Sequence, residues 1–274
     1  MSEYATSPDG TRIAFERAGR GPVVVLVDGA AMHRAFGTSR ELVRLLAHDV
    51  TAVAYDRRGR GESSDTAPWT PEREVEDLQA VIAAATGSRE DEPVVVHTLS
   101  SGAVLALLAV AHGAPIRALS LFEPPIELDG DITADSAQID KLTALVAADR
   151  RREAVQEFQA GIGMPAEMIA QQPPEVLAAL DLIAPTLVYD LTLSRTGMID
   201  PETLAGVTVP VQVISSDTGS GPLGGWAAAL ADALPHGRHR TLPGSWHGVP
   251  EDVLAPVIAE WANTAVSSPR VVGP

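Results

Sequence analysis

Two adjacent serines, Ser100 and Ser101, lie where an apolar β-branched run (VVVHTL, 94–99) meets an apolar run of helical length (103–111). A serine hydroxyl at such a junction has two ordinary uses. It is a nucleophile when a sharp turn lifts it above the end of a sheet, or a cap that accepts hydrogen bonds from the first N–H groups of the helix. A nucleophilic serine also needs a base within reach. The surrounding elements therefore decide which use applies.

Short β-type runs alternate with amphipathic or apolar helical segments along most of the chain. Continuously apolar strands such as PVVVLVD are typical of a parallel sheet covered by helices on both faces, and the alternation predicts a doubly wound α/β fold. The expected strands span 11–18, 22–28, 51–56, 93–98, 116–123, 209–215 and 238–243. The expected helices span 39–47, 71–86, 101–112, 223–234 and 250–262.

One stretch, 127–200, shows no strand pattern and contains helical pieces, notably 134–160 and 174–195. Open α/β sheets bind ligands beyond the carboxyl ends of their strands. We therefore expect 1–126 and 201–274 to form the core, and the helical insertion between them to form a lid over a pocket. The alternative is that the insertion only packs against one face of the sheet.

Three motifs follow one another in a recognisable order. VLVDGAAM (25–32) precedes AYDRRGRGES (54–63), whose Gly59 and Gly61 are spaced for a tight turn, and HTLSSG (97–102) comes next. Taken alone, the second motif would be a loop with three solvated arginines. Together with the insertion and a late histidine, however, the whole chain resembles the α/β-hydrolase superfamily. The resemblance implies a mostly parallel central sheet with helices on both faces and a helical lid inserted between strands.

The nucleophile elbow of that superfamily reads G-x-S-x-G, and here the segment reads TLSSG, with Thr98 in place of the first glycine. This register makes Ser100 the predicted nucleophile. A register on Ser101 would put the bulky Leu99 at a position for a small residue. A third register, aligned on His97, would put leucine at the nucleophile position and leave the protein without one.

The resemblance implies that His247, in the loop between the last strand and the final helix, takes the proton from Ser100. Two carboxylates could orient this histidine. Glu123 follows the strand that ends near 123, where some members such as the haloalkane dehalogenases carry the acid. Asp217 lies in the turn after the next strand, about two residues before the superfamily's commonest position. We favour Glu123 and keep Asp217 as the alternative.

The resemblance also implies an oxyanion hole made by the backbone N–H groups of Ala30 and Ser101. The superfamily's usual His-Gly pair in the first of these loops is Asp28-Gly29 here, which is a departure. Four residues near these loops are expected to border the substrate pocket: Asp28, Gly29, His33 and Trp246.

Composition excludes several classes of function. A net charge of -16 would repel nucleic acid and anionic lipid. The absence of cysteine excludes disulfides and thiolate metal sites, and the chain carries no metal-binding or nucleotide-binding motif. We therefore expect no metal, no cofactor and a small-molecule partner. With no signal-peptide pattern and no apolar run longer than 103–111, we expect a soluble, cytoplasmic protein. Whether it is a monomer or a homodimer is open.

Two hypotheses for the function follow. The first is a serine hydrolase that cleaves an ester, thioester or lactone of a small to medium apolar substrate through an acyl-enzyme. The second keeps the fold but uses the pocket for a lyase, cyclase or other biosynthetic reaction, because the departures at Thr98 and Asp28 weaken the match. A purely structural scaffold is less favoured, since the expected lid implies a pocket.

Overall fold

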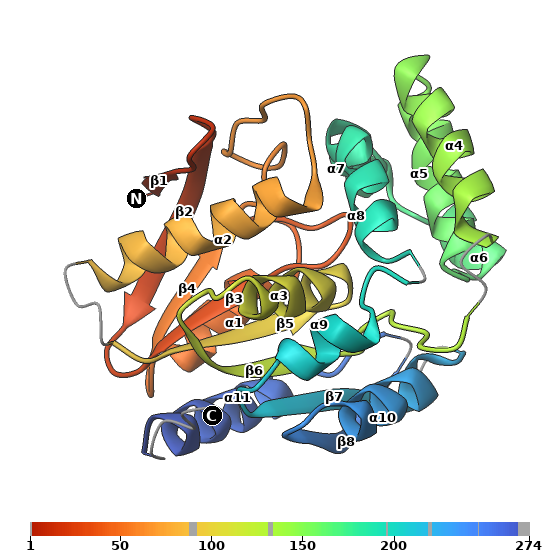
Figure 1. Ribbon diagram of the computed structural model, residues 1–274. Helices are drawn as coiled ribbons and strands as arrows, with labels where there is room; N and C mark the ends of the chain where they lie inside the picture. The colour runs from red at the N-terminus through yellow and green to blue at the C-terminus, as the bar shows by residue number, and fades with distance from the viewer. Residues whose placement is uncertain are drawn as a thin grey trace.

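The computed structural model describes residues 2–87, 92–130, 134–195, 197–218, 221–245 and 247–267. Its centre is an eight-stranded sheet in the order β1-β2-β4-β3-β5-β6-β7-β8 (Figure 1). The β1–β2 and β2–β4 pairs are antiparallel and the remaining pairs are parallel, which confirms the predicted fold class. In chain order the strands are β1 Glu3–Thr6, β2 Arg12–Gly19, β3 Val23–Val27, β4 Thr51–Tyr55, β5 Val94–Leu99, β6 Ile116–Phe122, β7 Val211–Thr218 and β8 Gly237–Ser245.

Helices cover both faces of the sheet because the central strands are apolar on both sides. In β3, Val23 and Val25 pack on one face, whereas Val24 and Leu26 pack on the other. The first face carries α2 Pro71–Thr86, α3 Ser101–Ala111, α9 Pro201–Gly206 and α10 Leu223–Ala233. The second carries α1 Ser39–Leu46 and α11 Glu251–Ser267.

The first strand, β1, was not among the strands expected from the sequence. It is four residues long, polar in part, and lies at the edge of the sheet. Its place is set by the turn that follows, where Gly10 has a φ of 87° and the Asp9 side chain accepts a hydrogen bond from the N–H of Thr11. The turn sequence SPDG was the available signal for a hairpin.

The helical insertion gathers at one end of the sheet, drawn from green to cyan in Figure 1. It contains α4 Ala134–Ala147, α5 Arg151–Gly161, α6 Ala166–Ala170, α7 Pro174–Ile183, the 3-10 turn η1 Ala184–Thr186 and α8 Leu187–Leu193. The two long helical pieces expected from the sequence are each broken. Asp149, with a φ of 54°, separates α4 from α5, and the turn at Ala184–Thr186 separates α7 from α8.

The segment Pro174–Leu193 is the one described helical stretch that is long and apolar enough to cross a membrane. It does not stand out in the sequence because Glu175, Asp181 and Asp190 interrupt its apolar run. In the structure it is bent by the 3-10 turn, and 39% of its most apolar window is buried within the protein. Its apolar residues form the core of the insertion together with Val155 and Phe158.

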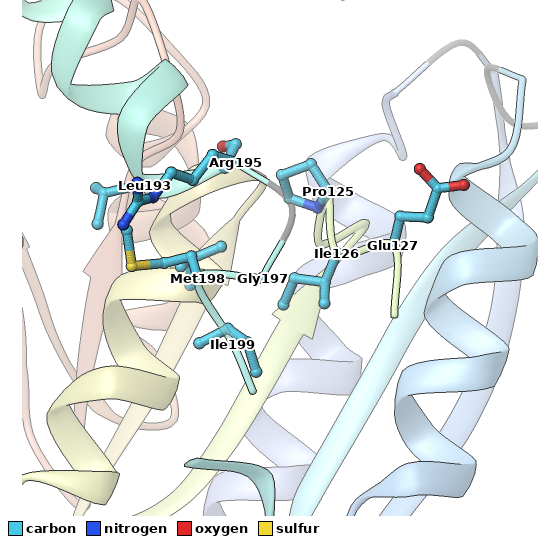
Figure 2. Close-up of a pocket in the computed structure, with 10 residues that line it drawn as sticks. Pro125, Ile126, Glu127, Leu193, Arg195, Gly197, Met198 and Ile199 are labelled. Atoms are coloured by element: carbon cyan, nitrogen blue, oxygen red, sulfur yellow. The ribbon is translucent and has the colours of Figure 1, made fainter. Parts of the chain in front are cut away.

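The two connections between the insertion and the core lie side by side. Figure 2 shows Pro125 and Ile126, which follow β6, opposite Met198 and Ile199, which lead into α9. The cavity that these segments enclose has a volume of about 10 Å³, which is the space of one water molecule.

Candidate active site

Ser100 stands on a strained turn between β5 and α3. Its φ is 52° and its ψ is -125°, a conformation that costs a non-glycine residue about 1–3 kcal/mol. Two backbone hydrogen bonds hold it, from the Ser100 N–H to the carbonyl of Phe122 (2.9 Å) and from the Ala103 N–H to the carbonyl of Ser100 (2.8 Å). Its hydroxyl makes no capping bond to α3. The capping role that the sequence left open is therefore wrong for Ser100.

Gly102 allows α3 to start close to the sheet. A Cβ at this position would lie 2.8 Å from the carbonyl oxygen of Val27 in β3, which is closer than real contacts allow. This glycine is therefore required by the close approach of helix and strand. Thr98, which replaces the other glycine of the motif, is fully buried in the sheet.

His247 and Glu123 are 124 positions apart in the sequence but are in contact in the structure. The Nδ1 atom of His247 lies 2.6 Å from Oε2 of Glu123, whose side chain is 0% exposed. The other oxygen, Oε1, accepts hydrogen bonds from the N–H and hydroxyl of Ser216. Burial raises the pKa of Glu123, but the bonds from His247 and Ser216 outweigh burial and hold this pKa below the ordinary glutamate value.

An ionised Glu123 accepts the proton of Nδ1–H, so this tautomer of His247 carries its lone pair on Nε2. Asp217, the alternative acid, is exposed and accepts a hydrogen bond from the N–H of Gly244 at 3.0 Å. The structure thus brings Glu123, and not Asp217, to the histidine. Asp217 lies on β7, the strand next to β8, but its carboxylate is held by Gly244, whereas Glu123, which follows β6, reaches the histidine.

A cavity of about 780 Å³ opens above these residues, between the sheet and the insertion. Ser100, Ser101 and His247 line this cavity, and so do Gly29 and Ala30. The insertion supplies a mostly apolar wall: Val155, Phe158, Ile162, Met164, Val176, Leu180, Leu187 and Leu191. The arrangement suits an apolar molecule with one reactive polar group.

Two of the expected pocket residues do not line this cavity, so that expectation is corrected. Asp28 is 3% exposed and accepts a hydrogen bond from the hydroxyl of Ser39. Burial raises its pKa to about 6 against the opposing effect of Ser39. His33 instead lies 4.0 Å from the carboxylate of Asp56. Trp246 lies outside the described residues.

His97, in the strand before the elbow, is not placed to act as a base on a ligand. It is buried, and its Nδ1 lies 3.0 Å from the hydroxyl of Ser120. Burial lowers its pKa to about 3, so the imidazole is neutral at ordinary pH.

The three arginines of the RRGR turn are buried, which corrects the view of them as solvated residues. Arg57, Arg58 and Arg60 are each at most 1% exposed. Arg57 forms an ion pair with Glu74 at 2.7 Å, and Arg58 pairs with Asp77 at 2.6 Å. Buried guanidinium groups need such partners because an unpaired buried charge is very costly.

Asp190 of α8 completes this set of ion pairs, and sequence reasoning did not single it out. It lies 2.7 Å from Arg57 and 2.6 Å from Arg60, and it accepts a hydrogen bond from the hydroxyl of Ser101 at 2.7 Å. The available signal was one acidic residue inside the apolar run LVYDLTL. Its partners are 130 and 133 residues away, so the pattern alone could not identify them.

Comparison with known proteins agrees with this fold. The model of the Alpha/beta hydrolase family matches residues 23–260. The structure of an alpha/beta hydrolase from Sphaerobacter thermophilus is 39% identical, with a TM-score of 0.83, over 94% of this chain and 99% of that one. Since the family match spans most of the chain, this protein belongs to the α/β hydrolase family and is an enzyme of the hydrolase type.

Two more distant structures share the fold. A thermophilic esterase from Thermogutta terrifontis is 20% identical, with a TM-score of 0.71, over 97% of this chain and 99% of that one. An enol-lactonase from Burkholderia xenovorans is 18% identical, with a TM-score of 0.68, over 97% of this chain and 100% of that one. Among curated proteins, none matches the chain.

Proposed function

We propose that this protein is a serine hydrolase that cleaves an ester, thioester or lactone of a small to medium apolar substrate through an acyl-enzyme. One observation carries the proposal. The 2.6 Å contact between His247 and the buried Glu123 lies at the end of the sheet from which Ser100 is raised. Both Ser100 and His247 line the same large cavity. A nucleophile, a base and an orienting acid are the parts that acyl transfer requires.

In the first half-reaction, the Oγ of Ser100 attacks the carbonyl carbon while Nε2 of His247 takes the hydroxyl proton. Glu123 stabilises the imidazolium that forms. The N–H groups of Ala30 and Ser101 donate hydrogen bonds to the oxyanion of the tetrahedral intermediate. The intermediate then collapses, the carbon–oxygen or carbon–sulfur bond to the leaving group breaks, and His247 protonates the departing alcohol or thiol.

In the second half-reaction, water attacks the acyl group on Ser100 and gives its proton to His247. Collapse of this second intermediate releases the carboxylic acid, and the proton returns to the Oγ of Ser100. A lactone follows the same steps, but its alcohol stays attached to the acid. All the groups used belong to the chain itself, so the proposal includes no cofactor and no metal.

The apolar wall of the cavity supports an apolar acyl or ring group as the substrate body. The esterase and the enol-lactonase among the similar structures make esters and lactones the first classes to assay. The proposal also includes the insertion acting as a lid, a small-molecule partner and action in the cytoplasm. The charge of -16 and the lack of cysteine favour the last two.

Hydrolysis of p-nitrophenyl esters of increasing acyl length tests the proposal. We expect steady turnover by the native protein and a loss of about 10⁴-fold or more in kcat in Ser100→Ala. Ser120→Ala is the matched control, because Ser120 is buried in the neighbouring strand β6 and contacts His97 rather than the cavity. Turnover by Ser100→Ala at the rate of the control would overturn the proposal.

A further inference from the structure

Asp190 is the point at which the helical insertion joins the site. Its side chain is 1% exposed, and it accepts hydrogen bonds from three groups of the core. Its Oδ1 accepts from Arg57 and from the hydroxyl of Ser101, both at 2.7 Å, and its Oδ2 accepts from Arg60 at 2.6 Å. Burial raises the pKa of Asp190, but Arg60 and Arg57 outweigh burial and hold this pKa below the ordinary aspartate value. The carboxylate is therefore ionised.

The hydrogen bond from the Ser101 hydroxyl to Asp190 fixes the side chain of Ser101. Its hydroxyl is held between Asp190 and the Nη1 atom of Arg57, which lies 3.2 Å away. The backbone N–H of the same residue is the oxyanion donor that follows the nucleophile in the proposed mechanism. A carboxylate on the insertion thus holds the side chain of a residue whose main chain faces the reaction.

The hydrogen bond from Arg60 to Asp190 acts on the second oxyanion donor, the N–H of Ala30. While Nη2 of Arg60 is bound to Asp190, its Nη1 donates to the carbonyl oxygen of Gly29 at 2.7 Å. The C=O of Gly29 and the N–H of Ala30 belong to one planar trans peptide group and point in opposite directions. Holding the oxygen toward the buried Arg60 therefore directs the N–H of Ala30 away from it, and Ala30 lines the cavity.

We propose that Asp190 is a positioning residue that sets both peptide groups of the oxyanion hole, so that docking of the helical insertion is coupled to transition-state stabilisation. This inference rests on the proposed function. It explains why a charged residue lies inside an otherwise apolar segment. It also explains why two arginines of one turn are buried against it, where an apolar contact would hold the insertion equally well.

A second buried ion pair in the same turn provides a matched control. Arg58 pairs with Asp77 at 2.6 Å, and these side chains are 0% and 2% exposed. The partners of Arg58 are Asp77, Asp9 and the carbonyl of Arg73, none of which belongs to the oxyanion loop or the elbow. Removing the charge of Asp77 therefore costs stability in the same way but leaves the oxyanion peptides in place.

The experiment compares Asp190→Asn with Asp77→Asn on p-nitrophenyl butyrate, with the folded fraction measured by near-UV circular dichroism. Removing one oxyanion donor outright costs about 10²–10³ in kcat, so we expect misplaced donors in Asp190→Asn to lower kcat by about 10–100-fold. We expect its KM to change by less than about threefold, since ground-state binding relies on the apolar wall. For Asp77→Asn we expect both constants within about threefold of the native values.

Binding of a trifluoromethyl ketone gives a second readout, because its adduct with a serine carries an oxyanion. We expect its affinity to fall in Asp190→Asn by the same factor as kcat/KM and to be unchanged in Asp77→Asn. Equal kcat values for the two variants would overturn the inference. So would a loss in Asp190→Asn that lies only in KM, because that is the sign of a loosened cavity wall.

If Asp190→Asn does not fold, Ser101→Ala tests the same contact, because it removes the hydroxyl and keeps the backbone N–H. We expect a loss of about 3–10-fold in kcat with KM unchanged, and an unchanged kcat would overturn the inference. Ser100→Ala is run in parallel. An active Ser100→Ala would contradict the proposed function. If Ser100→Ala is inactive but Asp190→Asn and Asp77→Asn have equal kcat values, only the positioning role is contradicted.

Discussion

Two buried carboxylates flank the strand that leads to Ser100, and they behave in opposite ways. Asp28 follows β3 on one side of β5, and Glu123 follows β6 on the other. They are 3% and 0% exposed. Burial raises the pKa of both groups, yet the pKa of Asp28 ends at about 6, whereas that of Glu123 ends below its ordinary value.

The difference lies in the hydrogen-bond partners. Glu123 accepts three bonds, from His247 and from the N–H and hydroxyl of Ser216. Asp28 accepts one bond from Ser39, and its Oδ2 finds no hydrogen-bond donor within the described part of the chain. Burial alone therefore does not make a carboxylate functional. The donors that accompany it decide whether it stays ionised and orients a base.

Of the changes at or beside these two carboxylates, neutralising Glu123 is expected to have the largest effect. Glu123→Gln keeps the shape but no longer stabilises the imidazolium, so we expect kcat for ester hydrolysis to fall by about 10³–10⁴-fold. Asp217→Asn is the control, since this carboxylate is exposed and accepts its hydrogen bond from the N–H of Gly244 rather than from His247. We expect it to stay within about twofold of the native kcat. If instead Asp217→Asn were the inactive variant, the choice of Glu123 would be wrong.

A smaller effect, on stability rather than on rate, is expected at Asp28. Its pKa of about 6 lies above the ordinary 3.8, so the folded state favours the protonated form. This contribution to stability is fully present below pH 3.8 and is lost as pH rises through 6. The asparagine side chain in Asp28→Asn does not ionise and loses no such stability. When pH is raised from 4 to 7.5, we therefore expect the unfolding free energy of Asp28→Asn to increase relative to that of the native protein by about 2–3 kcal/mol.

Urea unfolding at the two pH values measures this difference. Because the side chain of Asp28 does not line the cavity, ester turnover at pH 7.5 serves as the second readout, and we expect it to be retained. A stability difference between the two proteins that is the same at both pH values would contradict the assignment of a raised pKa.

The smallest effect is expected from Ser39→Ala, which removes the hydroxyl that bonds to Asp28. That bond lowers the pKa of Asp28, so without it the pKa rises further. The loss of stability with rising pH then moves to higher pH, by about half a unit to one unit. A series of urea midpoints from pH 5 to 8 tests this shift, and a displacement toward lower pH would contradict it.

The sequence predicted what depends on local pattern. Continuous apolar strands alternating with helices are sufficient for a mostly parallel sheet with helices on both faces, because burial on two sides demands that composition. The position of Ser100 also follows from its local surroundings, since a strand, a tight turn and Gly102 determine it. The choice of Glu123 over Asp217 needed the resemblance to a known superfamily as well.

What the sequence could not predict are pairings between distant charges. The buried arginines looked like surface residues, because nothing near 57–60 in the chain reveals that Asp190 lies against them. For the same reason Asp28 looked like a pocket residue until the structure placed it against Ser39. Such pairs arise only when the insertion and the loops dock, which is a property of the tertiary fold.

The most direct measurement is the site of covalent labelling by a fluorophosphonate, read by intact mass and peptide mapping. We expect one adduct per chain, on Ser100, with no adduct in Ser100→Ala and much slower labelling in Glu123→Gln. An adduct on Ser101, or a properly folded native protein that takes up no label, would contradict it.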